Sequence, residues 1–165
     1  MEKKDLLSNI HSACAVGVQL IPPTLLCDSI GSIGLKDPLV VRPETTLAEC
    51  VEVLQRHKVG SLLVVDEQGK LVGIFTERDC ILKVMGKVES LKGAVVRDFM
   101  TPNPVRERPE ASIAFALNLM SHGGFRHVPI VDQDDVPIGI ISVKDVVDHI
   151  VSRMLEAIYA ACEES

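Results

Sequence analysis

An internal repeat limits the folds open to this chain more than any other feature. A shift of 66 positions aligns Pro38–Asp79 with Pro104–Asp145 without a gap. Ten of the 42 aligned pairs are identical, and most of the other apolar positions stay apolar. Two copies are too few for a solenoid, so we expect two similar units packed around a pseudo-twofold axis that creates two equivalent clefts.

The first copy predicts five elements in a fixed order. A short strand begins at Pro38, and Thr46 is a suitable N-cap for the helix that follows. The continuous apolar run Ser61–Val65 is typical of a buried strand, a polar turn leads into a second hairpin arm, and another helix starts at Thr76. The unit is therefore predicted to be β-α-β-β-α, which places the chain in the α/β (α+β) class.

The second copy predicts the same order, with its first strand at Val105 and a final helix that continues through Ile158. The apolar stripe of this last helix is longer than one small unit needs. Either a helix of a second subunit or the chain's own sheet could cover it. Before the repeat, residues from Leu6 to Leu20 could form a short amphipathic helix that ends at a proline pair.

Composition narrows the classes of function. The chain has 165 residues, a net charge of −6, four Phe, one Tyr and no Trp, so it lacks the basic surface and the aromatic platforms that nucleic-acid binding uses. Five cysteines without a CxxC pair fit a reducing compartment, and we expect a cytoplasmic protein. No apolar run is long enough to span a membrane. Each unit alone would be marginally stable, so we expect the halves to share one core.

One motif stands at the same place in both copies. The residues from Gly73 to Asp79 and from Gly139 to Asp145 share the pattern Gly, two apolar residues, Thr or Ser, any residue, Arg or Lys, and Asp. A hydroxyl and a carboxylate three residues apart at a helix start point to one side, where the carboxylate can accept hydrogen bonds from a diol. The helix N-terminus can assist a phosphate. The same spacing also describes a capping box, and the two roles are compatible.

The sequence resembles the tandem cystathionine-β-synthase (CBS) domain pair, or Bateman module, over residues 28–153. The resemblance is carried by both β-α-β-β-α units, the Asp66 and Asp132 turns, both hydroxyl-plus-Asp motifs, and residues 98–102 at the opening of the second unit. It implies two pseudo-twofold-related units packed through their sheets. It also implies that their clefts bind adenine nucleotides such as AMP, ADP or ATP.

The resemblance further implies roles for individual residues. Asp79 and Asp145 would hold ribose hydroxyls, and Thr76 and Ser142 would bind the ribose or the first phosphate. Adenine would lie near Ile74 and Ile140 and near the segments before the first strands, which in this family often belong to the opposite unit. Those segments are Asp37-Pro38 and Asn103-Pro104.

The two clefts are expected to differ in positive charge. Arg126 and His127 match positions where related modules place basic residues against phosphates, whereas the first copy has Gly60 and Ser61 there. Phosphates would then be neutralised from one side, by this pair together with Arg78 and Lys144, so occupancy of a single cleft is an open alternative. Without the resemblance, Arg126 would be read as a surface charge and His127 as an ordinary strand residue.

Three functions remain to be weighed. The leading one is a regulatory module that senses adenine nucleotides, acts in trans on an unidentified target protein, and forms a homodimer. The second is an interaction scaffold whose clefts no longer bind nucleotide. The third is a small enzyme that uses Cys80 or His127, although the sequence shows no catalytic constellation, metal-ligand cluster or catalytic cofactor motif.

We divide the chain into an N-terminal extension of residues 1–27, a first unit of residues 28–88, a second unit of residues 89–153, and a C-terminal helix extension of residues 154–165.

Overall fold

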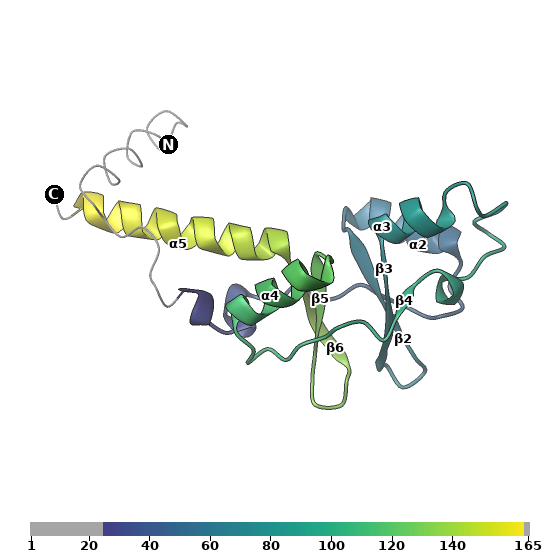
Figure 1. The fold of residues 1–165 in the computed structure, drawn as a ribbon, viewed down its shortest axis with the longest axis horizontal. Helices are drawn as coiled ribbons and strands as arrows, with labels where there is room; N and C mark the ends of the chain where they lie inside the picture. The colour runs from purple at the N-terminus through teal and green to yellow at the C-terminus, as the bar shows by residue number, and fades with distance from the viewer. Residues whose placement is uncertain (1–24, 164–165) are drawn as a thin grey trace.

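The computed structural model describes residues 25–163 as two similar halves that lie side by side (Figure 1). The helix expected between Leu6 and Leu20 lies outside the described residues. The elements of the first half are β1 (Val40–Val41), α2 (Leu47–His57), β2 (Ser61–Val65), β3 (Leu71–Thr76) and α3 (Glu77–Asp79), which continues into a π-helical turn at Cys80–Val84. Those of the second half are α4 (Ile113–Gly123), β5 (His127–Val131), β6 (Pro137–Ser142) and α5 (Val143–Glu163). This mixed α/β architecture confirms the predicted fold class.

Local sequence explains why the first helix of each half begins where it does. Thr46 accepts a hydrogen bond from the backbone N–H of Glu49, whose side chain in turn accepts one from the Thr46 backbone, so α2 opens with a capping box. Ser112 caps α4 through the N–H of Phe115. On both helices the apolar residues spaced three and four apart face the interior, and the buried ones are Leu47, Cys50, Leu54, Ile113, Ala116 and Met120.

One predicted strand is wrong. Val40 and Val41 pair with β2 in parallel, but around Val105 the structure has no strand and only an isolated bridge between Glu107 and Ile130. The cause is a proline. Leu63 donates its backbone N–H to the Leu39 carbonyl, whereas Pro129 occupies the position equivalent to Leu63 and has no N–H to donate.

The segments before the two repeats exchange places between the halves. Residues 28–36 precede the first half but pack on the second, where Ile30 donates to the Ala111 carbonyl and is fully buried. Residues 94–102 pack in the same way on the first half, where Val96 donates to the Thr45 carbonyl. This second segment contains β4 (Thr101–Pro102), which pairs with β3. The exchange ties the halves together.

Two glycines that the repeats share make room for the exchanged segments. A Cβ built on Gly73 would lie 2.2 Å from the sulfur of Met100, and one built on Gly139 would lie 2.9 Å from the Cβ of Leu35. Real Cβ atoms do not approach other atoms so closely. Glycine makes room at both positions for a segment that crosses the hairpin: a side chain at 139 would collide with the Leu35 Cβ, and one at 73 would force the Met100 side chain aside.

The core is not single, contrary to the expectation from length. Each half has its own cluster of buried apolar residues, one centred on Phe75 and the other on Ile130. A third, smaller cluster of Leu63, Leu71, Ile74 and Val131 joins the two hairpins. The exchanged segments add Ile30 and Val96 to the opposite halves, so each half completes a core of its own.

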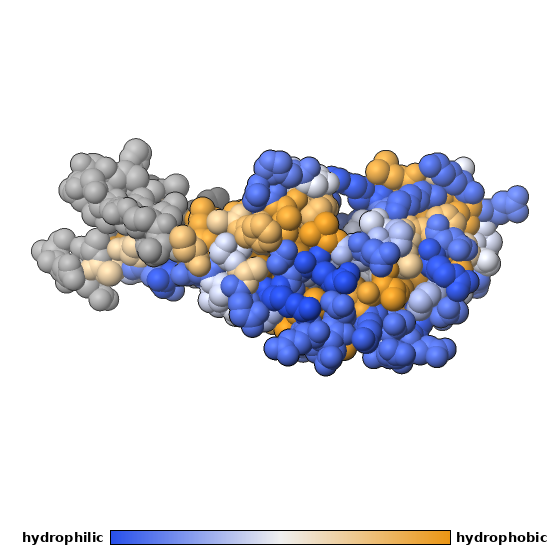
Figure 2. All heavy atoms as spheres, turned by 60° about the horizontal axis from the view of Figure 1, so that its bottom comes forward, coloured by the Kyte–Doolittle hydropathy of each residue, from blue (hydrophilic) through white to orange (hydrophobic). Residues whose placement is uncertain are grey.

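The long helix α5 divides into two parts. In its first turns Val146 is fully buried, and Val143 and Ile150 pack against the core of the second half, so this part covers the chain's own sheet. Farther along, α5 projects beyond the body of the molecule (Figure 1). Within the first part, next to the buried residues, Val147 and Val151 remain exposed at 49% and 42%. Hydrophilic side chains cover the edge that carries the hairpin turns, and apolar surface shows elsewhere on the same face (Figure 2).

Candidate functional site

The two hydroxyl-plus-Asp motifs cap the helices that follow them. In the first half, Oδ2 of Asp79 accepts hydrogen bonds from the Thr76 backbone N–H at 2.9 Å and from the Thr76 hydroxyl at 2.7 Å. In the second half, Oδ2 of Asp145 accepts from the Ser142 N–H at 2.8 Å and from the Ser142 hydroxyl at 2.5 Å. Capping therefore uses Oδ2 of each carboxylate and leaves Oδ1 available to other partners.

A lysine binds the other oxygen in each half. Lys83 lies one turn along the same helix, with its Nζ 2.7 Å from Oδ1 of Asp79. Lys36 comes from the exchanged segment, with its Nζ 2.6 Å from Oδ1 of Asp145. Burial raises the pKa of Asp145, but the hydrogen bonds from Lys36 and Ser142 outweigh it and hold that pKa below its ordinary value. The Asp145 carboxylate is thus ionised and paired with Lys36 at neutral pH.

Cleft 1 lies between the start of α3 in the first half and residues 101–105 and 123–127. Its volume is about 370 Å³. The predicted residues that line it are Ile74, Thr76, Arg78, Asp79, Asn103, Pro104, Gly60, Arg126 and His127. Thr101, Val105, Gly123, Gly124 and Phe125 complete its wall. Arg78 spans the opening and donates to the Gly124 carbonyl at 2.6 Å, which links the two halves across the cleft.

Cleft 2 is the counterpart at the start of α5 in the second half, with a volume of about 340 Å³. The predicted residues that line it are Asp37, Ile140, Ser142, Lys144, Asp145, Gly60, Ser61, Arg126 and His127. It also contains Lys36, Leu39, Lys58, Val59, Glu77 and Val143. Pro38 is not among the lining residues, although its neighbours Asp37 and Leu39 are. Lys144 does not cross the cleft as Arg78 does, because its ammonium pairs with Asp148 on its own helix.

Arg126 and His127 face both clefts, as does Gly60. The sequence assigned this basic pair to one side of one cleft, but the pseudo-twofold axis places it where the clefts meet. Burial, and then the neighbouring Arg126 charge, lower the pKa of His127, so its ring is neutral at pH 7. Arg126 therefore supplies the fixed positive charge that the two clefts share.

Several residues that line a cleft, and Lys83, which contacts Asp79 from outside the lining of cleft 1, were missed at the level of sequence. Lys36 stands one position before Asp37, and Lys83 follows Asp79 by four residues, a spacing at which a helix brings opposite charges together. Lys58 reaches cleft 2 because it ends α2 in the left-handed conformation, at φ 53°, where its repeat counterpart is Gly124. Phe125, next to Arg126, gives cleft 1 an aromatic wall that cleft 2 lacks.

The described part of the chain holds no cluster of three or more metal-ligating side chains. Burial, and then the adjacent Asp79 carboxylate, raise the pKa of the Cys80 thiol, which disfavours the reactive thiolate. Between residues 25 and 163, no helix has the length and apolar character needed to cross a bilayer.

Comparison with protein families decides what this arrangement is. The model of the CBS domain matches the chain twice, at residues 30–86 and 96–152. The chain belongs to the CBS domain family, as a tandem pair. This CBS pair is 31% identical over 121 residues to an uncharacterized 17.7 kDa protein of Acidianus ambivalens, covering 73% of the chain and 71% of that protein. It is 30% identical over 118 residues to an uncharacterized protein of Methanopyrus kandleri, covering 72% of the chain but 60% of that protein.

Solved structures agree with this assignment. A CBS-domain containing protein from Agrobacterium tumefaciens is 33% identical, with a TM-score of 0.67 over 73% of this CBS pair and 98% of that chain. CBSX2, a CBS-pair protein of Arabidopsis thaliana, was solved in complex with AMP and is 28% identical, with a TM-score of 0.67 over 75% of this chain and 97% of that one. The CBS domain pair of protein MJ0100, bound to 5′-methylthioadenosine and S-adenosyl-L-methionine, is 25% identical, with a TM-score of 0.67 over 73% and 98%. The last two of these relatives bind adenosine ligands.

Some relatives are enzymes, but the likeness covers only a part of them. Inosine-5′-monophosphate dehydrogenase of Methanocaldococcus jannaschii is 34% identical over 114 residues, which are 22% of that enzyme. The shared part is the CBS region.

Proposed function

We propose that this CBS pair binds adenosine phosphates (AMP, ADP or ATP) in clefts 1 and 2 and passes their level to a target protein. The observation that carries the proposal is the lining of the clefts. Each cleft contains the carboxylate at a helix start, an apolar strand residue beside it, and residues of the segment exchanged from the other half, and Arg126 lines both clefts. An acid for the ribose, apolar edges for adenine and a cation for phosphate are thereby brought together. The complex of CBSX2 with AMP supports the same ligand class.

Regulation in trans follows from what the described residues contain. They form two CBS units and show no catalytic constellation, so we propose no enzymatic activity and an output made through another protein. A ligand can shift that output only by its differential affinity for two states of the module, a coupling of about 1–3 kcal/mol in typical cases. Cys27, Cys50 and Cys80 are free thiols, which suits a reducing compartment such as the cytoplasm.

A homodimer is part of the proposal because the repeat places two matching apolar patches on the surface. Ile81 and Met85 follow α3 and are exposed at 62% and 68%. Their repeat counterparts are Val147 and Val151 on α5, which are also exposed. We propose that the two patches together bind the same patches of a second copy around a twofold axis.

Calorimetric titration and thermal shift with AMP, ADP and ATP test the nucleotide proposal. Ligand at 100 times its Kd should stabilise the protein by about 2.7 kcal/mol. The variants Asp79→Ala and Asp145→Ala should each lower affinity at their own cleft by about tenfold or more, because a hydrogen bond to a charged group is lost. Glu52→Ala removes an exposed carboxylate of α2 that lines neither cleft and should bind as the wild type does.

A scaffold without nucleotide is the second candidate. The observation in its favour is that Lys83 and Lys36 already neutralise both carboxylates. Wild-type protein that shows neither heat of binding nor a thermal shift with any of the three nucleotides would favour the scaffold.

A further inference from the structure

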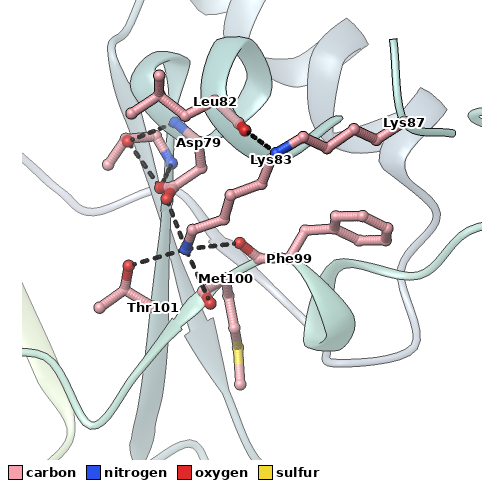
Figure 3. A network of polar contacts seen from close by, with 8 residues as sticks. Asp79, Leu82, Lys83, Lys87, Phe99, Met100 and Thr101 are labelled. Carbon is pink, nitrogen blue, oxygen red and sulfur yellow. Dashed lines mark hydrogen bonds and ion pairs between the residues drawn. The ribbon is translucent and has the colours of Figure 1, made fainter. Parts of the chain in front are cut away.

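Lys83 makes polar contacts beyond the ion pair with Asp79 on its own helix. Besides Oδ1 of Asp79, its Nζ lies 3.0 Å from the Phe99 carbonyl, 3.3 Å from the Met100 carbonyl and 3.2 Å from the Thr101 hydroxyl (Figure 3). These three acceptors follow one another in the segment that leads from the first half into the second. One ammonium group thus binds both the cleft carboxylate and this linker.

The Asp79 carboxylate has little acceptor capacity left. A carboxylate offers about four lone-pair positions. Two hydrogen bonds from Thr76 use Oδ2, and Lys83 uses one position on Oδ1. Because Asp79 is only 7% exposed, a ligand hydroxyl that reaches it must approach the oxygen that Lys83 already holds.

The linker that Lys83 holds is itself a wall of cleft 1. Thr101 and Asn103 line the cleft, and the Asn103 N–H donates to the Val72 carbonyl at 3.0 Å, which fastens the linker to β3. Met100 packs on Gly73 at the same place. A change in the bonds of Lys83 therefore acts directly on the contact between linker and hairpin.

Cleft 2 has no equivalent arrangement. The counterpart of Lys83 is His149, which faces Asp28 across 4.0 Å instead of Asp145. Asp145 is paired with Lys36, whose side chain is 72% exposed and whose Nζ hydrogen-bonds no other residue of the described chain. A ligand in cleft 2 can displace Lys36 into water without disturbing any other contact of that ammonium.

We propose that Lys83 is a positioning residue that couples occupancy of cleft 1 to the linker between the CBS units. A ligand hydroxyl that takes Oδ1 of Asp79 shifts Lys83 toward the linker acceptors at residues 99–101, which tightens β4 on β3. Cleft 1 is then the cleft from which ligand binding is transmitted. This inference rests on the proposed nucleotide function.

Amide hydrogen exchange of Asn103, followed by NMR on the full chain, tests the coupling. In ligand-free protein Lys83→Met should raise the exchange rate of Asn103 by about fivefold, in line with the loss of a partly exposed ion pair and its hydrogen bonds. Lys87→Met is the matched control, because within residues 25–163 the Lys87 ammonium donates to the Leu82 carbonyl of its own helical segment and to no other group. Lys83→Arg, which keeps the charge beside Asp79, should restore most of the protection. The Val131 amide, bonded to the Glu107 carbonyl in the second half, should not change in any variant.

Saturating AMP completes the test. In wild-type protein AMP should slow Asn103 exchange by about threefold or more, and in Lys83→Met by less than about twofold although AMP still binds. Equal Asn103 exchange in Lys83→Met and Lys87→Met would overturn the proposal, as would an AMP effect of the same size in wild type and Lys83→Met. AMP that binds without the Lys83-dependent change overturns the coupling alone. Wild-type protein that does not bind AMP in a parallel titration overturns the nucleotide function and the coupling with it.

Discussion

Gly60 and His127 lie in contact where clefts 1 and 2 meet. A Cβ built on Gly60 would be 3.2 Å from both Cε1 and Nε2 of the His127 ring and 3.4 Å from Oε2 of Glu77. Gly60 is the repeat counterpart of Arg126, and His127 directly follows Arg126 in the second copy. The first copy has glycine at position 60, where the second copy has Arg126. The lack of a side chain there leaves the space that the His127 ring occupies.

Gly60→Ala should therefore displace His127 and disturb both clefts. We expect a loss of about 1 kcal/mol in the free energy of unfolding, measured in urea, and weaker AMP binding at both clefts by calorimetry. Gly93→Ala is the control, because its added Cβ meets only the Ser90 carbonyl at 3.9 Å. An unchanged Gly60→Ala protein would show that the ring moves aside freely.

Variants of three N-cap residues can separate the role of a hydroxyl in capping its helix from a role in binding AMP. Thr76→Ala, Ser142→Ala and Thr46→Ala each remove an N-cap hydroxyl, and each should destabilise the protein by about 1 kcal/mol in urea unfolding. Thr46 lies at the start of α2 and lines neither cleft. Only Thr76→Ala and Ser142→Ala should weaken AMP binding. Equal affinity in all three variants would mean that both hydroxyls serve the helices alone.

His127 should make the protein less stable in mild acid. Because the fold holds the pKa of His127 below its ordinary value of 6.5, the unfolded chain takes up this proton first as the pH falls. The free energy of unfolding should decrease below about pH 6.5 and level off below the pKa of the folded state. His127→Gln should reduce this slope in urea unfolding between pH 7 and pH 5. Parallel slopes in the two proteins would contradict the prediction.

The Lys36–Asp145 pair has a pH dependence of the same sign, at lower pH. The folded pKa of Asp145 lies below the ordinary value of 3.8, so the pair stabilises the protein above that pH and is lost as the pH falls through the folded pKa. Lys36→Met should cost less than about 1 kcal/mol at pH 7, because Lys36 is largely exposed. It should also raise the pKa of Asp145 in an NMR titration of the carboxyl group. Lys92→Met, an exposed lysine outside both clefts, should leave that pKa as it is.

The apolar patches should hold a dimer together. Light scattering after gel filtration should give wild-type protein twice the chain mass of 18.0 kDa. Met85→Glu and Val151→Glu place charges in the two patches and should give the monomer mass. Phe115→Glu is the control, because Phe115 is 46% exposed on α4, outside the patches, and its repeat counterpart is already Glu49. A monomeric wild-type protein would contradict the proposed assembly.

Much of the fold could be predicted because its signals are local. The helices α2 and α4 follow from an apolar stripe and an N-cap, and the hairpins follow from two apolar runs around a polar turn, as at Asp66. The strand at Val105 was predicted wrongly because its failure depends on Pro129, a residue 24 positions away that faces it only in the folded sheet. Lys83 could have been found from its helical spacing to Asp79.

The sequence alone determined that there are two units, that each ends in a hydroxyl-plus-acid helix start, and that one copy lacks the basic pair. Only the tertiary structure decided which residues share a cleft. The exchange of residues 28–36 and 94–102 brings Lys36 to Asp145 and Thr101 to cleft 1, and the pseudo-twofold axis turns Arg126 toward both clefts. Periodicity and capping act within a few residues along the chain, whereas these contacts join segments far apart in the sequence, and only packing brings such segments together.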